Sequence, residues 1–160
     1  MRRFHVHISV DDIAQSTVFY TNLFGQPKRV EPDYVKWMIE DPRLNFAISK
    51  RGSEAGIDHL GIQVDSDEEL KSMREQLESA DSSLVSETDA SCCYSKSDKY
   101  WITDPQGIAW ETYRTLGTIP TFGGGRATIE PTESPGSCCV SAAEIIVPGK
   151  NPTKARACCG

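Results

Sequence analysis

The stretch His5-Val6-His7-Ile8-Ser9-Val10-Asp11 recurs later in the chain as His59-Leu60-Gly61-Ile62-Gln63-Val64-Asp65. Histidine, isoleucine, valine and aspartate hold the same places in both stretches, at a constant offset of 54 residues. A period of this length indicates two copies of one supersecondary unit, because a solenoid needs at least three repeats. The sequence therefore predicts two equivalent modules.

Each copy has the pattern of a strand, a helix and further strands. The alternation at residues 4–10 is typical of a half-buried strand, and a helix is expected to begin after Asp11-Asp12 and to end at Gly25. Further strands are expected at 34–39, 44–49, 59–64, 84–87, 99–103 and 108–113, with a second helix that Ser66 or Asp67 caps. The prediction is an α+β fold of two βαβββ modules, at about 1–50 and 57–115.

The composition changes after Leu116. Glycine and proline make up 12 of the last 45 residues, a share typical of flexible segments. We therefore expect a folded domain over residues 1–116 and a flexible tail over 117–160. The tail holds two adjacent cysteine pairs, to which the sequence assigns no role: Cys138, Cys139, Cys158 and Cys159.

The charge balance narrows the range of partners. The 160 residues carry 17 basic and 23 acidic side chains, a net charge of −6, which argues against binding to nucleic acid or an anionic membrane surface. No apolar run approaches the ~20 residues of a membrane span. Arg2 and Arg3 are not followed by the apolar region of a signal peptide. We expect a cytoplasmic protein, in which the thiols stay reduced.

Equivalent positions in two related modules face each other, so His5 and His59 are expected to converge. His7 points to the same face as His5, but its repeat counterpart is Gly61, which weakens its claim as a ligand. A carboxylate at Glu111 lies in an apolar strand, where an unpaired charge is unfavourable, while Ala47 holds the matching place in the first module. His5, His59 and Glu111 thus form a two-histidine, one-carboxylate set, which suits non-haem Fe(II) and oxygen chemistry.

The second module is longer than the first. Residue 47 follows His5 by 42 positions, whereas Glu111 follows His59 by 52. The ten additional residues fall around 88–97, where we expect a loop beside the metal site. This segment carries Cys92 and Cys93, two adjacent thiols that suit a soft, thiophilic ligand. We interpret them as a substrate clamp.

These motifs resemble the vicinal-oxygen-chelate superfamily, which includes glyoxalase I, bleomycin-resistance proteins and extradiol dioxygenases. The resemblance covers residues 1 to about 116 and is closest to the bacterial carbon–arsenic lyases and their cadmium-induced relatives. It rests on His5-Val-x-Ile-x-Val-Asp, Leu23-Phe24-Gly25, His59-Leu60-Gly61-Ile62, Cys92-Cys93-Tyr94, Asp98-Lys99-x-Trp101 and Thr103-Asp104-Pro105-x-Gly107 with Trp110-Glu111. His7 departs from the pattern, because relatives often carry a small residue there.

The resemblance implies an Fe(II)- and dioxygen-dependent lyase of arsenic resistance, which cleaves the carbon–arsenic bond of methylarsenite or reduced aromatic arsenicals and releases arsenite. It places the metal on His5, His59 and Glu111, with Mn, Co, Ni or Zn as other occupants, and the arsenic on Cys92 and Cys93. A homodimer is compatible with it. No catalytic residue beyond the metal centre follows, although Tyr94 and Tyr100 lie near enough to be considered as proton donors.

Two alternatives remain open at this stage. The first is a protein that sequesters arsenic or cadmium without a reaction, although it would not need His5, His59 and Glu111. The second is another enzyme of the superfamily, a glyoxalase-type lyase or an extradiol dioxygenase. A glyoxalase normally has a fourth carboxylate, and Ala47 stands in that position.

Overall fold

The computed structural model describes residues 1–51, 54–80 and 83–124. Ten elements follow one another in this part of the chain: β1 (Arg3–Ser9), α1 (Ile13–Phe24), β2 (Arg29–Glu31), β3 (Tyr34–Glu40), β4 (Arg43–Ser49), β5 (Gly56–Val64), α2 (Asp67–Ala80), β6 (Val85–Cys92), β7 (Ser95–Thr103) and β8 (Ala109–Thr118). They form two consecutive βαβββ units, so the predicted α+β fold of paired modules is confirmed.

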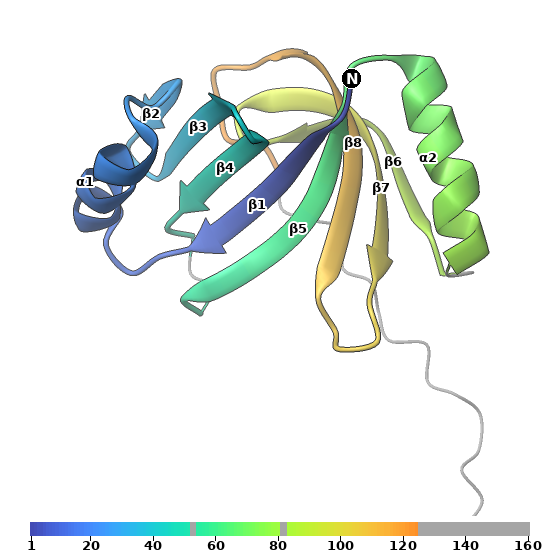
Figure 1. Cartoon of the computed structure of the whole chain (residues 1–160), viewed down its shortest axis with the longest axis horizontal. Coiled ribbons are helices and arrows are strands. Elements are labelled where there is room, and N and C mark those ends of the chain that lie inside the picture. Colours follow the sequence, from blue (N-terminus) through green and yellow to red (C-terminus); the bar gives the residue numbers. More distant parts are fainter. Residues whose placement is uncertain (52–53, 81–82, 125–160) are drawn as a thin grey trace, which may run out of the picture. The chain divides into compact units, whose positions relative to one another are not determined.

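The strands join into one sheet of order β2-β3-β4-β1-β5-β8-β7-β6. Figure 1 shows this sheet curled into a half-barrel, with α1 at one end and α2 at the other. The modules meet where β1 pairs with β5 in antiparallel fashion. Each module also contains one parallel pair, β1 with β4 and β5 with β8. The first strands of both modules therefore lie at the centre of the sheet.

Alternation along the central strands separates the two faces of the sheet, because successive side chains of a strand point to opposite sides. In β1, the buried residues are the polar Arg3, His5, His7 and Ser9. Val6 and Ile8 point the other way and pack with α1 against a core of Val35, Trp37, Phe46 and Ile48. The apolar face thus stabilises the fold, while the opposite face buries polar side chains, His5 and His7 among them.

Helix α1 begins and ends, and helix α2 begins, where the sequence predicts. The Asp12 carboxylate accepts a hydrogen bond from the Gln15 amide at 2.9 Å and caps α1, while Gly25 ends the helix at a φ of 81°. The Ser66 hydroxyl accepts a hydrogen bond from the Glu69 amide at 3.2 Å, so it caps α2. Met1, through its amino group, lies 2.7 Å from Glu69 and ties the start of the chain to this helix.

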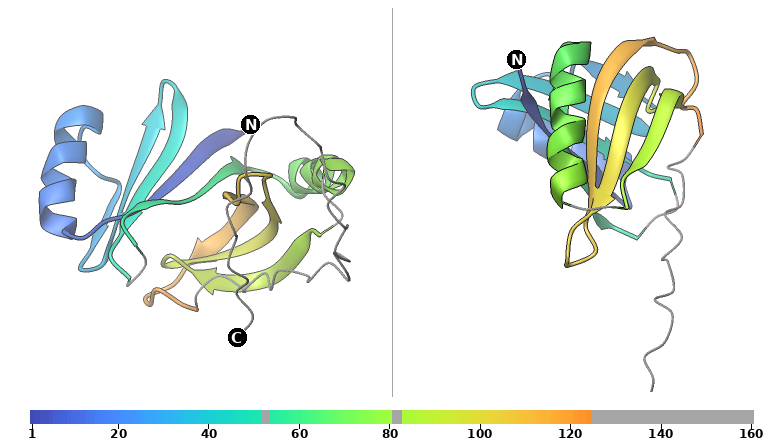
Figure 2. Two further views of the ribbon diagram at one scale, coloured as in Figure 1. Left: turned by 90° about the horizontal axis from the view of Figure 1, so that it is seen from below. Right: turned by 90° about the vertical axis from the view of Figure 1, so that its right-hand side faces the viewer.

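The loop expected at residues 88–97 is wrong, because this segment forms the end of a β-hairpin. These residues continue β6 and β7, which pair as far as Cys92 opposite Ser95. The additional length therefore extends a hairpin, as Figure 2 shows for the yellow and green strands at the edge of the sheet. Hydrogen bonds of the ladder hold this segment more rigidly than a loop would.

Strand β8 runs to Thr118, and Phe122 packs against Tyr34 and Tyr94. The boundary placed at residue 116 therefore falls within β8. The division into a folded domain and a flexible tail stays a prediction. The four tail cysteines lie outside the described residues. Within the described part, no helix combines the length and apolar character that crossing a membrane requires.

Candidate functional site

All three histidines of the chain meet on the polar face of the central strands. His5 and His7 come from β1 and His59 from β5, and each is almost fully buried. One ring nitrogen from each lies within 4.8 Å of the others, an arrangement that could hold a metal ion. The Nε2 atoms of His5 and His59 are 3.2 Å apart, so the predicted convergence of these two residues is present.

Oxygen acceptors fix the orientation of the two rings. His5 Nδ1 donates to the Asn45 carbonyl at 2.9 Å, and His59 Nδ1 donates to the Asp58 carboxylate at 2.6 Å. In the neutral rings the lone pairs then belong to the two Nε2 atoms, which point at each other. Outer hydrogen bonds of this kind are typical of histidines that bind metals.

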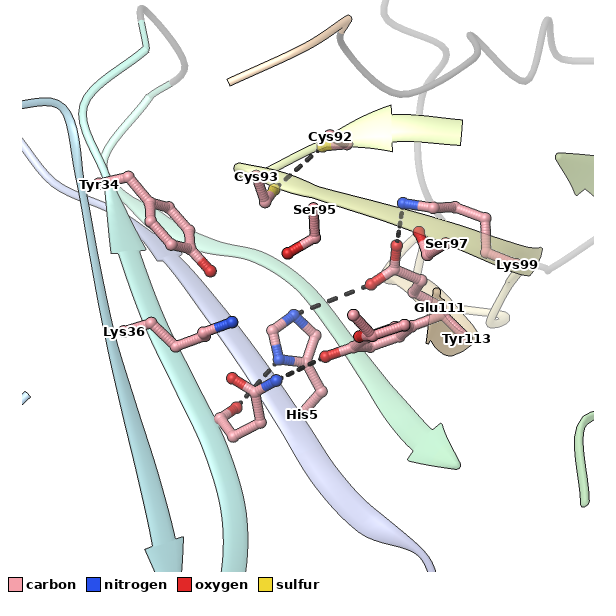
Figure 3. A pocket seen from close by; sticks show the side chains of 12 residues that line it. His5, Tyr34, Lys36, Cys92, Cys93, Ser95, Ser97, Lys99, Glu111 and Tyr113 are labelled. Atoms are coloured by element: carbon pink, nitrogen blue, oxygen red, sulfur yellow. Dashed lines mark hydrogen bonds and ion pairs between the residues drawn. The ribbon is translucent and has the colours of Figure 1, made fainter. Parts of the chain in front are cut away.

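Glu111 supplies a carboxylate to the same point from β8. Its Oε2 atom lies 3.8 Å from His5 Nε2 and 3.5 Å from His59 Nε2, and its Oε1 atom accepts a hydrogen bond from Lys99 Nζ at 2.6 Å. Figure 3 shows Glu111 between Lys99 and His5. The structure thus brings together all three residues of the predicted ligand set.

The separations between these atoms fit a common cation. Adjacent ligands about 2.1 Å from a divalent metal lie roughly 3.0–3.5 Å apart for octahedral to tetrahedral angles. The observed distances of 3.2, 3.5 and 3.8 Å are close to that range. Two lone pairs and a carboxylate oxygen that converge in a buried place therefore suit a divalent metal.

This arrangement shifts the pKa values of His5, His59 and Glu111. Burial and the neighbouring His59 lower the pKa of His5 to about 4. Burial alone would lower the pKa of His59, but its contacts with Asp58 and Glu111 raise it to about 9. Burial would raise the pKa of Glu111, yet Lys99 and the two histidines hold it below its usual range. The two neighbouring carboxylates therefore favour the protonated form of His59, whereas burial favours the neutral form of His5.

The strand register explains why Glu111 reaches this point. Glu111 pairs with Gly61 in the second module, as Ala47 pairs with His7 in the first. The predicted equivalence of Ala47 and Glu111 is therefore present. A Cβ atom on Gly61 would lie 2.2 Å from the Glu111 carbonyl oxygen, so glycine is required for β5 and β8 to come this close.

The two thiols lie at the tip of the β6–β7 hairpin. Cys93 and Tyr94 form its two-residue turn with φ values of 57° and 60°. Turns of this type prefer Asn-Gly, and left-handed backbone in other residues is unfavourable by about 1–2 kcal/mol each. Contacts with the first module compensate, because the Tyr94 hydroxyl donates to Asp33 at 2.6 Å and Arg29 donates to the Tyr94 carbonyl at 3.2 Å.

This anchored turn places Cys92 and Cys93 opposite the histidine cluster. Their sulfur atoms are 3.0 Å apart, and both thiols are free. The hydrogen bond from Cys93 lowers the pKa of the Cys92 thiol, while donating it raises the pKa of Cys93. Both cysteines line a cavity of about 870 Å³ together with His59 and Glu111. The two thiols therefore lie beside the candidate metal centre, and Cys92 is the one that loses its proton more readily.

The sequence reasoning also missed three residues that line a second cavity at the site. Tyr34, Lys36 and Tyr113 line a smaller cavity of about 30 Å³ that also contacts His5 and both thiols, and Figure 3 shows Tyr34 and Lys36 directed into it. The alternation at 34–40 could have found Tyr34 and Lys36, because both fall on one face of β3. By contrast, the Tyr94 hydroxyl is bound to Asp33, away from the histidines.

The fold and this site agree with a comparison of sequences. A model of the glyoxalase/bleomycin resistance protein/dioxygenase superfamily matches residues 2–112. The chain therefore belongs to this superfamily, and the resemblance inferred from the motifs is confirmed.

Curated relatives are similar over most of the chain. A trivalent organoarsenical cleaving enzyme from a Bacillus strain is 37% identical over 147 residues, which cover 88% of this chain and 84% of that protein. A probable enzyme of the same name from Bacillus subtilis is 35% identical and covers 88% and 92%. The cadmium-induced protein CadI of Mycobacterium tuberculosis is 30% identical and covers 87% and 93%.

Solved structures share the fold at low identity. Homoprotocatechuate 2,3-dioxygenase from Arthrobacter globiformis matches with a TM-score of 0.54 at 16% identity, over 76% of this chain and 38% of that chain. A Mn(II)-bound glyoxalase from Novosphingobium aromaticivorans matches with a TM-score of 0.53 at 16% identity, over 79% and 44%.

Proposed function

We propose that this protein cleaves the carbon–arsenic bond of trivalent organoarsenicals with Fe(II) and dioxygen. In this proposal His5, His59 and Glu111 hold the metal, while Cys92 and Cys93 hold the arsenic. The single observation that carries it is the shared cavity, which both thiols line together with His59 and Glu111. The names of the relatives, organoarsenical cleaving enzymes among them, support the same reaction.

The thiol pair is suited to select trivalent arsenic. A compound RAs(OH)₂ exchanges both hydroxyls for thiolates and releases two waters, so the arsenic keeps a single bond to carbon. The lowered pKa of Cys92 favours attack by this thiol first, and Cys93 follows from 3.0 Å away. The strained turn at Cys93 and Tyr94 keeps the two sulfur atoms on one side of the cavity. Bringing the reactants together in this way lowers the entropic barrier to reaction.

The remaining groups prepare the metal site. Fe(II) bound here would supply the capacity to activate dioxygen, the chemistry typical of two-histidine, one-carboxylate sites. The Asn45 carbonyl and the Asp58 carboxylate keep both imidazole Nε2 atoms free to bind. Lys99 occupies Oε1 of Glu111 and thereby leaves Oε2 for the metal. Burial of these groups excludes water, which strengthens each electrostatic interaction.

The overall reaction needs no external reductant for methylarsenite. The atoms of CH₃As(OH)₂ and O₂ together equal those of As(OH)₃ and formaldehyde. Carbon gives up the four electrons that dioxygen takes, while arsenic stays trivalent. We therefore propose arsenite and an aldehyde as the products of the methyl substrate.

The test is a single-turnover assay. The protein is loaded with Fe(II) without oxygen, mixed with methylarsenite and exposed to air, and the arsenic species are separated. We expect arsenite from the native protein and none from His59→Ala or from the Cys92→Ser/Cys93→Ser double variant. The matched control, Cys138→Ser/Cys139→Ser, is expected to react at saturating substrate.

Two other outcomes would favour the alternatives. Methylarsenite that binds tightly and leaves unchanged would indicate sequestration. Native protein that neither binds nor cleaves methylarsenite would favour a glyoxalase-type or ring-cleaving enzyme of its superfamily. Full turnover in the Cys92→Ser/Cys93→Ser variant would instead remove the clamp from the reaction.

A further inference from the structure

His7 has no place in the proposed ligand set, yet it lies beside it. Its side chain is 4% exposed. Nε2 lies 2.8 Å from the Ser49 hydroxyl, while Nδ1 is buried without a hydrogen-bond partner in the described part of the chain. An unsatisfied buried nitrogen is unfavourable and requires an explanation.

The position of the ring offers one. His7 pairs directly with His59 across β1 and β5, and the centroids of these two rings are 4.8 Å apart. A ring nitrogen of His7 lies within 4.8 Å of the candidate ligand atoms of His5 and His59. Opposite ligands about 2.1 Å from a metal are roughly 4.2 Å apart, a separation close to this one.

The three histidines also share one pattern of hydrogen bonding. In each, an oxygen atom contacts one ring nitrogen: the Asn45 carbonyl for His5, the Asp58 carboxylate for His59 and the Ser49 hydroxyl for His7. When His7 Nε2–H donates to Ser49, the lone pair lies on Nδ1, the atom without a partner. This pattern is the one that ligating histidines show when an outer hydrogen bond fixes the tautomer.

We propose that His7 binds the same metal through Nδ1, so that three imidazoles and the Glu111 carboxylate form the centre. This inference rests on the proposed metal site of His5, His59 and Glu111. Four protein ligands leave two open positions in an octahedral site instead of three. His7 has Gly61 as its counterpart in the repeat, so the fourth ligand is a property of the first module alone.

The chain itself simplifies the test, because it contains only three histidines. Long-range ¹H–¹⁵N spectra of the full chain without an affinity tag are recorded during titration with Zn(II). We expect one nitrogen in each of the three rings to shift, with Nδ1 as the shifted atom of His7. Shifts confined to His5 and His59 would overturn the role of His7. No shift in any ring would instead contradict the metal site itself.

Variants provide a second, independent measurement. His7→Leu removes the unsatisfied Nδ1 but also the partner of the buried Ser49 hydroxyl, so the metal-free variant is expected to unfold at a similar or lower denaturant concentration. The affinity of Ser49→Ala for Zn(II) is expected to fall by about 10-fold, the lower end of the range found when outer hydrogen bonds are lost. The affinity of His7→Leu is expected to fall further, because this variant loses the ligand itself. Unchanged Zn(II) affinity in His7→Leu would contradict the proposal, whatever its stability.

Discussion

Replacement of Gly61 by alanine tests how closely the two strands of the second module must approach. The new Cβ would lie 2.2 Å from the Glu111 carbonyl oxygen and 3.1 Å from its carbonyl carbon. Real Cβ contacts are essentially never shorter than 3.0 Å, so β8 must move away by about 0.8 Å. Because the obstructing atoms belong to the backbone, no side-chain rotation can relieve the contact.

This displacement is expected to lower both the stability of the fold and its affinity for a metal. Overpacking of this kind destabilises a fold by about 1–3 kcal/mol, which corresponds to a melting temperature lower by roughly 3–10 °C for a chain of this size. The movement also draws Glu111 away from His59, so affinity for a divalent metal is expected to fall. Denaturant unfolding and metal titration of the same preparation measure both effects.

Gly117→Ala, in the neighbouring strand β8, is the matched control. A Cβ atom there meets nothing within 4 Å, so the change is expected to leave stability unchanged or to raise it by about 0.4–1 kcal/mol. Metal affinity of this variant is expected to equal that of the native protein. If Gly61→Ala behaved like Gly117→Ala in both assays, the close approach of β5 and β8 would not position Glu111, and our account of the site would be refuted.

Three further results are expected. Cys92→Ser or Cys93→Ser should abolish binding of methylarsenite while one equivalent of Fe(II) still binds, and loss of both would place the thiols in the metal site instead. The hydrogen bond from Cys93 lowers the pKa of Cys92, so iodoacetamide should modify Cys92 before Cys93, with a midpoint below that of an ordinary thiol; peptide mass spectrometry that found Cys93 modified first would contradict this order. Hydrogen bonds from the Ile108 amide, the Trp110 indole and the Gln106 amide lower the pKa of Asp104. This carboxylate therefore stabilises the fold at pH values above its ordinary pKa, and the stabilisation is lost as the pH falls through the lowered pKa. Asp104→Ala should therefore unfold more readily at neutral pH and approach the native protein in acid, whereas an equal difference at both pH values would count against this linkage.

The repeat in the sequence predicted most of the fold because each half encodes the same local pattern. Asp12, Gly25 and Ser66 mark helix ends through contacts within a few residues, which a sequence pattern can reveal. The β6–β7 hairpin was misread as a loop, because residues 88–97 have little apolar alternation and their pairing is set by the neighbouring strand. Its turn also lacks the Asn-Gly signal, since contacts with Asp33 and Arg29 from the other module stabilise it.

In the candidate site, too, the residues marked by a sequence pattern were predicted, and those placed by contacts between strands were not. His5 and His59 could be predicted because symmetry places equivalent residues opposite each other, and Glu111 because a charge in an apolar strand requires a partner. Lys99 was not predicted as that partner, because its contact with Glu111 depends on the β7–β8 register. His7 was set aside because its repeat counterpart is glycine, yet the pairing of β1 with β5 places it directly opposite His59.

The most direct test of carbon–arsenic cleavage is the stoichiometry of one turnover without added reductant. Protein loaded with Fe(II) is mixed with methylarsenite in buffer of known oxygen content, and oxygen uptake, arsenite and formaldehyde are measured together. Our account predicts one dioxygen consumed and one formaldehyde formed for each arsenite released. Arsenite formed at the same rate under nitrogen, or formed only when an external reductant is supplied, would contradict it.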